Sequence, residues 1–366
     1  MRRFSSFRDF DWMLLTLVFL MSIISVLEIK SATLHTKFRG FDHKQIGFLL
    51  VGLALMFLVS RIDYHWLVDI APWAYGIGLL SLVAVKLVGT TVLGGKRWIN
   101  LGGGVHFQPS EWVKLVLIVM MARYFWGLAG RDLSWVDIAK AFAMIGVPMV
   151  LVFKQPDLGT ALTYLPVLVV GLFLGGIRMK QTVVLLLLFA MIGGGAWLSG
   201  KRLKGYQMAR INSFINPDTD PRGTGYQILQ SKIAVGAGGL WGKGTNQGTQ
   251  TQGDFLPIPY TDFIFAAFCE EHGFVGGVAI LLLYFLILMR LIENAQQASD
   301  VPGTFIVMGV AAVLLFQILV NIGMVVGLMP VTGIPLPLMS YGGSSILFTF
   351  LALGIVMNIR MRRFVN

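Results

Sequence analysis

Residues 254–289 read DFLPIPYTDFIFAAFCEEHGFVGGVAILLLYFLILM, and this stretch contains the two features that decide the fold. A polar, glycine-rich segment from 201 to 261 ends at Asp262, and an uninterrupted apolar run from 274 to 289 follows soon after. Apolar runs of this length are typical of membrane-spanning helices. The contrast predicts a membrane protein in which a carboxylate lies at the boundary between a hydrophilic loop and the bilayer.

The same apolar pattern recurs along the whole chain. Hydrophobic residues make up 56% of the 366 residues, and charged residues only 13%. Hydrocarbon cannot satisfy free backbone groups and no barrel-like alternation is present, so the sequence predicts helices. We therefore expect an all-α, polytopic integral membrane protein, a single domain over residues 1–366 with about ten transmembrane helices. The predicted spans are 12–27, 46–59, 70–85, 115–129, 141–153, 158–177, 182–198, 274–289, 305–329 and 346–357.

The distribution of basic residues predicts the orientation of the chain. Ten helices place both termini on one side, and the termini and even-numbered connections contain thirteen Lys and Arg, against eight in the short opposite connections. This bias favours cytoplasmic termini in a multi-pass protein of the cytoplasmic (inner) membrane. The loop at 200–262, between helices 7 and 8, is then extracytoplasmic.

Composition and motifs exclude several kinds of partner and cofactor. The net charge of +11 is spread over many connections, which favours anionic lipid headgroups over nucleic acid. The single cysteine, Cys269, predicts a small buried residue and no zinc site. The run GAGGLWGKG at 236–244 lacks the first glycine and the hydroxyl of a phosphate loop, so no nucleotide or organic cofactor is expected. Its glycines indicate either a mobile loop or one that wraps sugars.

Ionisable residues inside or against apolar segments are the main functional candidates. A charged group at membrane depth costs about 2.5 to 3.5 kcal/mol, so each must face protein, a partner or a water-filled cavity. Five acidic residues meet this description: Glu111, Asp157, Asp262, Glu270 and Glu271.

Asp262 is the strongest of these candidates. It follows 257–261 (PIPYT) and precedes an apolar segment, so Asp262 or Thr261 is predicted to cap a helix. Partial desolvation raises the pKa of a carboxylate towards the range of a useful general base, so the same residue is also a catalytic candidate.

Two further motifs combine helix starts with charged side chains. Glu111 and Lys114 are three residues apart, a spacing that brings them together on one helix face, either as an internal ion pair or as the lining of a substrate cavity. Asp157, in QPDLGT, is predicted to cap a helix, with an ion or substrate contact as the alternative.

Short motifs follow one another along nearly the whole chain: RWI at 97–99, QPSE at 108–111, QPDLGT at 155–160, GYQ at 225–227, QSK at 230–232, TDFIFA at 261–266, EE at 270–271, PLP at 335–337 and SYGG at 340–343. Taken together and in order, these motifs resemble the SEDS family of shape, elongation, division and sporulation proteins. The segments 321–325 and 330–335 resemble the rod-elongation members more than the division members.

The resemblance implies a peptidoglycan glycosyltransferase that polymerises lipid II on the outer face of the cytoplasmic membrane during elongation. It also implies a class B penicillin-binding protein (a transpeptidase) and other elongation-complex membrane proteins as partners. The family's catalytic aspartate corresponds to Asp262, and its other acidic and basic site residues to Glu111, Lys114 and Asp157. The histidine that usually precedes the family's Thr-Asp pair is Tyr260 here, so a proton-sharing role at that position is not expected to carry over.

The residues also support this chemistry directly. A lipid diphosphate is a good leaving group, so one base suffices and inversion at the sugar is expected, in contrast to the two carboxylates of glycoside hydrolases. The diphosphate would be held by a divalent cation (Mg²⁺ or Mn²⁺) or by basic residues, with Arg97, Lys114, Arg210 and Lys232 as candidates. The alternatives are a lipid II flippase or transporter, and a non-catalytic scaffold of the elongation complex.

Overall fold

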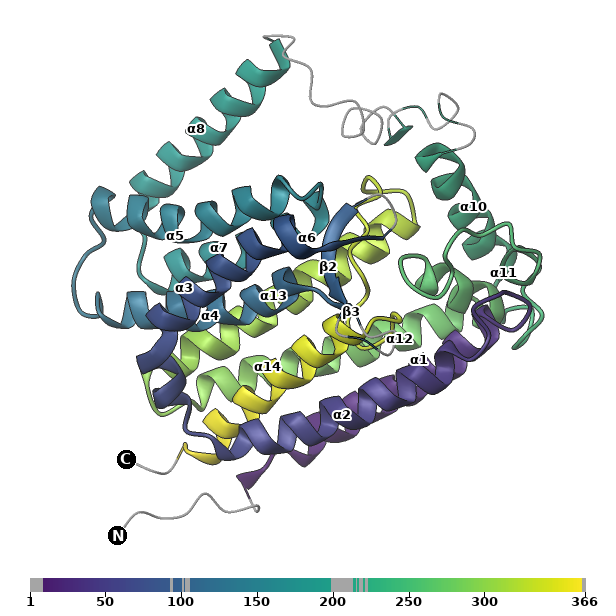
Figure 1. Cartoon of the computed structure of the whole chain (residues 1–366), viewed down its shortest axis with the longest axis horizontal. Helices are drawn as coiled ribbons and strands as arrows, with labels where there is room; N and C mark the ends of the chain where they lie inside the picture. The colour runs from purple at the N-terminus through teal and green to yellow at the C-terminus, as the bar shows by residue number, and fades with distance from the viewer. Residues whose placement is uncertain are drawn as a thin grey trace.

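The computed structural model describes residues 9–92, 95–100, 102, 106–198, 213–214, 216, 220 and 223–363 (Figure 1). Apolar runs form the long helices. The helices are α1 (Trp12–Ala32), α2 (Phe41–Arg61), α3 (Tyr64–Val88), α4 (Pro109–Trp126), α5 (Trp135–Phe153), α6 (Leu158–Leu162), α7 (Leu165–Leu174), α8 (Met179–Leu198), α10 (Thr224–Ala237), α11 (Thr249–Gln252), α12 (Ile264–Gln296), α13 (Val301–Val325) and α14 (Gly343–Met361).

Each of the ten predicted spans falls on a helix or a helix pair, which confirms the helical membrane fold. Among the described residues, seven helices are long and apolar enough to cross a membrane: α1, α2, α3, α5, α12, α13 and α14. The other predicted spans correspond to α4, to the consecutive α6 and α7, and to α8.

Two spans differ from their prediction for local reasons. The span at 158–177 is divided between α6 and α7, and Pro166 lies in the first turn of α7, where a missing N–H is tolerated. The span predicted at 274–289 belongs to a longer helix, α12, which begins at Ile264 and is interrupted at Gly273 (φ 68°). Residues 264–272 therefore form a separate helical segment before the kink.

A small antiparallel sheet between α3 and α4 was not predicted. Its strands are β1 (Thr90–Val92), β2 (Gly95–Asn100) and β3 (His106–Phe107), in the order β1-β2-β3. Ile99 pairs with Phe107, and Asn100 with His106. The sheet positions the side chain of Arg97 over the start of α6.

The core is centred on α4, α13 and α14, whose residues are mostly buried. In the most apolar stretch of 18 residues of each helix, 67% of the residues of α13 and 78% of those of α14 are buried, compared with 22% for α2. Cys269 is buried, as predicted. The ion pair between Arg363 and Asp9 (3.4 Å) places both ends of the described chain at one end of the bundle. The segment 223–262 lies at the other end, where Gln252 bonds to the last turns of α1.

Candidate functional site

The segment before α12 does not place Asp262 at a helix cap. The chain makes a further turn, in which the amide of Thr261 donates to the carbonyl of Ile258 (3.2 Å). The N-cap position is then Phe263, whose side chain cannot accept a hydrogen bond. The prediction that Asp262 or Thr261 caps the helix is wrong, because this turn delays the helix start to Ile264.

Hydrogen bonds from α13 and from the segment before α14 hold the backbone around Asp262. The side-chain amide of Asn321 donates to the carbonyl of Asp262 (3.0 Å) and to that of Ile334 (2.8 Å). The hydroxyl of Ser340 donates to the carbonyl of Thr261 (2.7 Å) and accepts from the amide of Leu336 (2.8 Å). The two irregular segments 257–263 and 334–341 thus form one bonded unit.

The carboxylate of Asp262 is half-buried and lies against Gly333. A Cβ at Gly333 would lie 3.6 Å from Asp262 Oδ2, and Gly333 has φ +72°, a conformation that favours glycine. The carboxylate is therefore held by a rigid backbone segment at the edge of the fold, with part of its surface accessible.

Aromatic side chains surround Tyr260, two residues before Asp262. The Tyr260 ring contacts those of Phe38 (5.0 Å between centroids), Phe41 (5.5 Å) and Tyr341 (6.1 Å). Burial raises the pKa of Tyr260 to about 12, and the neighbouring Tyr341 and Asp262 add to the rise. Tyr260 is thus a neutral hydroxyl at physiological pH, in agreement with the expectation that it does not share protons as a histidine would.

Asp157 caps α6, as the sequence predicts, and it also contacts two other side chains. Its Oδ1 accepts from the amide of Thr160 (3.1 Å) and lies 3.7 Å from Arg97 Nη1, and its Oδ2 accepts from Gln108 Nε2 (3.0 Å). Arg97 also donates to the carbonyls of Gln155 and Pro156. The structure thus brings Arg97 and Asp157 together, and the guanidinium makes contacts within the protein.

The segment 332–333 connects the surroundings of Asp157 to those of Asp262. A Cβ at Gly159, in α6, would lie 2.5 Å from the carbonyl oxygen of Thr332. Gly333 is the next residue and lies against Asp262. Two motifs that are about a hundred residues apart in the sequence therefore flank one short backbone segment.

Glu111 and Lys114 form an ion pair near the start of α4, at 2.8 Å. Lys114 is completely buried, and its ammonium group also lies 4.3 Å from the centre of the Phe348 ring on α14. The pair agrees with the i, i+3 spacing, and the second contact is a cation–π interaction.

The remaining predicted basic residues are in different situations. Lys232 is exposed on α10, and its side chain packs against Gly327 just after α13. Arg210 lies outside the described residues.

The glycine-rich segment 236–244 packs its backbone against that of α12. The amides of Lys243 and Gly244 donate to the carbonyls of Glu270 and Glu271, both at 3.0 Å. A Cβ on Gly242 would overlap the carbonyl of Glu271. Glycine is required here for close approach of two backbones, a contact that sequence alone does not reveal.

Glu28, near the end of α1, is a buried acidic residue (2% exposed) that was not among the predicted functional candidates. The predicted first span stopped at Leu27, whereas α1 continues to Ala32. A lone carboxylate beside an apolar run was the signal that would have found it.

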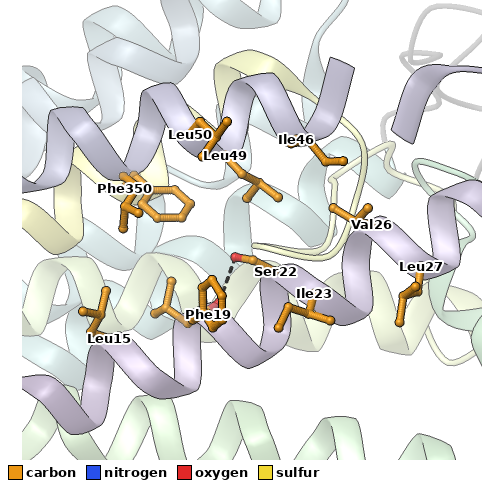
Figure 2. A pocket seen from close by; sticks show the side chains of 12 residues that line it. Leu15, Phe19, Ser22, Ile23, Val26, Leu27, Ile46, Leu49, Leu50 and Phe350 are labelled. Atoms are coloured by element: carbon orange, nitrogen blue, oxygen red, sulfur yellow. Dashed lines mark hydrogen bonds between the residues drawn. The ribbon is translucent and has the colours of Figure 1, made fainter. Parts of the chain in front are cut away.

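An apolar groove lies between α1, α2 and α14 (Figure 2). Its volume is about 280 Å³, and its polar lining residue, Ser22, donates its hydroxyl to the carbonyl of Val18 (2.8 Å). The groove has no ionisable lining residue and so provides no acid or base. The residues that line it are Leu15, Val18, Phe19, Ser22, Ile23, Val26, Leu27, Ile46, Leu49, Leu50, Leu53 and Phe350.

Comparison with known proteins agrees with this arrangement. A family model for cell cycle proteins, FTSW_RODA_SPOVE, matches residues 8–364. The peptidoglycan glycosyltransferase MrdB of Escherichia coli is 39% identical over 327 residues, which cover 88% of this chain and 86% of that protein. The peptidoglycan glycosyltransferase RodA of Treponema pallidum is 33% identical over 427 residues, which cover 97% and 98%.

Solved structures are similar over the same length. A structure described as "Structural coordination of polymerization and crosslinking by a peptidoglycan synthase complex" matches with a TM-score of 0.84 and 34% identity, covering 98% of this chain and 99% of that chain. The rod shape determining protein RodA of Thermus thermophilus matches with a TM-score of 0.72 and 30% identity, covering 98% of each chain. The chain therefore belongs to the FtsW, RodA and SpoVE family of cell cycle membrane proteins.

Proposed function

We propose that Asp262 is the general base with which this peptidoglycan glycosyltransferase polymerises lipid II into glycan strands at the outer face of the cytoplasmic membrane. The observation that carries the proposal is the position of Asp262: a half-buried carboxylate, one residue before the N-cap of α12, on a backbone held by Asn321 and Ser340. A base must be held in one place and still reach its substrate, and this arrangement meets both needs.

The reaction needs one proton acceptor. Asp262 removes the proton from the acceptor sugar hydroxyl, and the resulting oxygen forms a bond to the anomeric carbon of the donor sugar. The bond from that carbon to the lipid diphosphate breaks with inversion, and the diphosphate leaves with the electron pair. Because diphosphate is stable as an anion, the step requires positive charge near the leaving group more than a general acid.

Basic side chains or a divalent cation would supply that positive charge. Arg97 and Lys114 pair with Asp157 and Glu111, whereas Lys232 is exposed to solvent, so we assign the diphosphate contact to Lys232. A divalent cation (Mg²⁺ or Mn²⁺) is the alternative, and it would take its ligands largely from the diphosphate. Among the described residues, no group of three or more acidic, His or Cys ligands includes Asp262.

The orientation and the partner follow from the same proposal. The termini lie in the cytoplasm and the segment 200–262 outside the cell, in keeping with the bias of basic residues. A class B penicillin-binding protein cross-links the new strands, which is supported by the similarity to a solved peptidoglycan synthase complex that coordinates polymerisation and crosslinking. Other membrane proteins of the elongation complex join the same assembly.

The test is polymerisation of lipid II by the purified full-length protein, with the partner transpeptidase present in every reaction. We expect Asp262→Asn to reduce the rate about 10²- to 10⁴-fold, the usual contribution of a general base. Asp254→Asn is the matched control: Asp254 is an exposed acid on the same segment, its positive φ of 58° is tolerated by asparagine, and its substitution should leave the rate unchanged. Full activity of the Asp262→Asn variant would refute the proposed role.

A further inference from the structure

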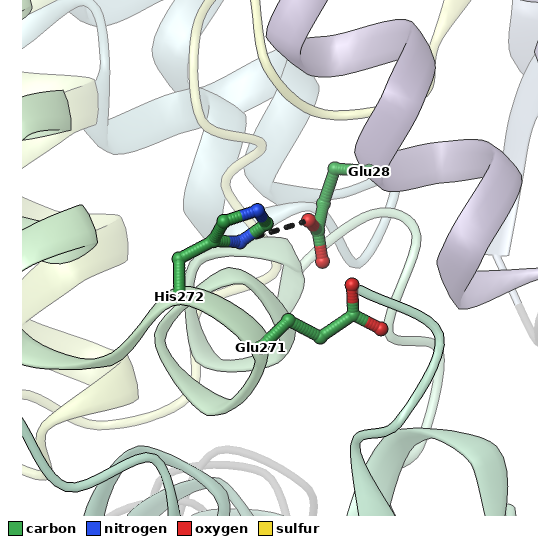
Figure 3. Close-up of side chains that lie close together, drawn as sticks. All are labelled: Glu28, Glu271 and His272. Carbon is green, nitrogen blue, oxygen red and sulfur yellow. Dashed lines mark ion pairs between the residues drawn. The ribbon is translucent and has the colours of Figure 1, made fainter. Parts of the chain in front are cut away.

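Glu28 of α1 comes together with Glu271 and His272 of α12, at the end of the bundle that carries the segment 223–262 (Figure 3). The ligand atoms of the three side chains all lie within 4.8 Å of one another. Glu28 is 2% exposed and Glu271 1% exposed, whereas His272 is partly exposed. Two acidic groups are therefore buried next to each other, with a route to solvent along the imidazole.

Each carboxylate leaves one buried oxygen unused. Glu28 Oε1 and Glu271 Oε2 accept no hydrogen bond from any described residue. The other oxygen of Glu271 accepts from the hydroxyl of Ser31 and from Gln252 Nε2 (3.4 Å), and Glu28 Oε2 lies 3.9 Å from His272 Nδ1. In Figure 3 the two carboxylates face each other across the gap. Buried acceptors are normally bonded, so the two unpaired oxygens need a partner, which a shared proton or a bound cation would supply.

Glu270, the residue before Glu271, is also a buried carboxylate, but both of its oxygens accept hydrogen bonds. It accepts from the amides of Gln250 (2.8 Å) and Thr251 (3.0 Å) and from the Thr251 hydroxyl (2.8 Å). It also pairs with Lys243 at 3.4 Å. The ammonium group of Lys243 is therefore engaged with Glu270, and the negative charge of Glu28 and Glu271 is left to a proton or a bound cation.

We propose that Glu28, Glu271 and His272 bind a divalent transition-metal cation of the Mn²⁺ or Zn²⁺ type, which clamps the end of α1 to α12. Two carboxylate oxygens and an imidazole nitrogen suit such cations, and water would complete the coordination. Ligands about 2.1 Å from a shared metal lie roughly 3 to 4 Å apart, so the side chains need to move closer by roughly 1 Å. His272 Nδ1 also lies 3.3 Å from the carbonyl of Phe268, a contact that the metal would replace.

The position of this site indicates what the cation would do. The carbonyl of Glu271 receives the amide of Gly244, and Gln252 bonds to both Ser31 and Glu271. A cation at Glu28 and Glu271 would thus fasten α1, the kinked start of α12 and the segment 236–252 to one another. Asp262 follows that segment, so the clamp would stabilise the backbone that leads to the proposed base.

The experiment measures metal binding without lipid II, so its outcome is independent of the proposed function. Full-length protein in a neutral detergent is treated with EDTA, dialysed and titrated with Mn²⁺, and free Mn²⁺ is followed by electron paramagnetic resonance. We expect one Mn²⁺ per chain, displaced by Zn²⁺, and a rise in the unfolding temperature on adding Mn²⁺. Glu28→Gln and Glu271→Gln should each weaken binding by about tenfold or more.

Two variants and one measurement keep the test decisive. Glu293→Gln alters an exposed carboxylate at the far end of α12 and should bind Mn²⁺ like the wild type. His272→Gln changes the partly exposed ligand and should fold even where the buried substitutions do not. Wild-type protein that binds no Mn²⁺ and unfolds at the same temperature in Mn²⁺ and EDTA would overturn the proposal in favour of a proton shared by Glu28 and Glu271. Binding that is unchanged in all the variants would assign the cation to another place and overturn it equally.

Discussion

The buried pair of Glu111 and Lys114 makes a quantitative prediction about stability. Their charged atoms are 2.8 Å apart, which at an effective dielectric constant of about 20 corresponds to an attraction of about 6 kcal/mol. The Phe348 ring adds up to about 2 kcal/mol for a desolvated cation. Removing two ions from water costs several kcal/mol each, so the intact pair contributes little net stability.

Loss of one partner is strongly destabilising, because it leaves the other charge buried and unpaired. We expect Lys114→Met alone, or Glu111→Leu alone, to lower the free energy of unfolding by about 3 to 5 kcal/mol. The double variant replaces both charges with apolar groups of similar size and should be close to the wild type. Because the two single effects then nearly cancel in the double variant, the substitutions should show a coupling energy of about 6 kcal/mol or more.

The assay is unfolding of the full-length protein in detergent, followed by tryptophan fluorescence, for the wild type, both single variants and the double variant. Polymerisation of lipid II by the same four proteins separates the two roles that the spacing left open. An ion pair with a purely structural role recovers activity together with stability, whereas a substrate contact stays lost. A double variant as unstable as the sum of the single ones would show that the reasoning about desolvation is wrong.

Three further predictions concern the segments that precede Asp262. Gly242→Ala should lower the free energy of unfolding by about 2 to 4 kcal/mol, since its Cβ would overlap the Glu271 carbonyl at φ +83°. Gly236→Ala, whose Cβ would meet nothing within 4 Å inside α10, should change it by no more than about 1 kcal/mol, and unfolding of both variants in denaturant checks the contrast. Burial raises the pKa of Tyr260 to about 12, above its ordinary value of 10.0, so the folded protein favours the neutral hydroxyl. The resulting contribution to the free energy of unfolding is complete below about pH 10 and is lost as the pH rises from about 10 to about 12. Tyr260→Phe should remove this alkaline part of the stability profile, measured as unfolding temperature against pH; a profile identical to the wild type would contradict the assignment. Tyr260→His should introduce a new dependence of polymerisation on pH between about 5 and 8, where imidazole titrates, and the pH–rate profile would show it.

Several features of the site could be read from short stretches of sequence. Asp157 caps α6 and Glu111 pairs with Lys114 because both interactions operate within one helical turn. The cap predicted at Asp262 failed although it is equally local. One extra turn at 258–263 moves the N-cap from Asp262 to Phe263, and turn formers such as PIPYT do not specify where a turn ends.

The sequence by itself determined the membrane-spanning helices, since hydropathy is summed over about twenty consecutive residues and needs no partner. The tertiary structure alone decided that Gly333 lies against Asp262, that the glycines of 236–244 admit the backbone of α12, and that Glu28 faces Glu271. The Ser31–Glu271 hydrogen bond joins residues 240 positions apart. Such contacts depend on how helices pack together, and side-chain packing is a property of the folded chain that no local window of sequence contains.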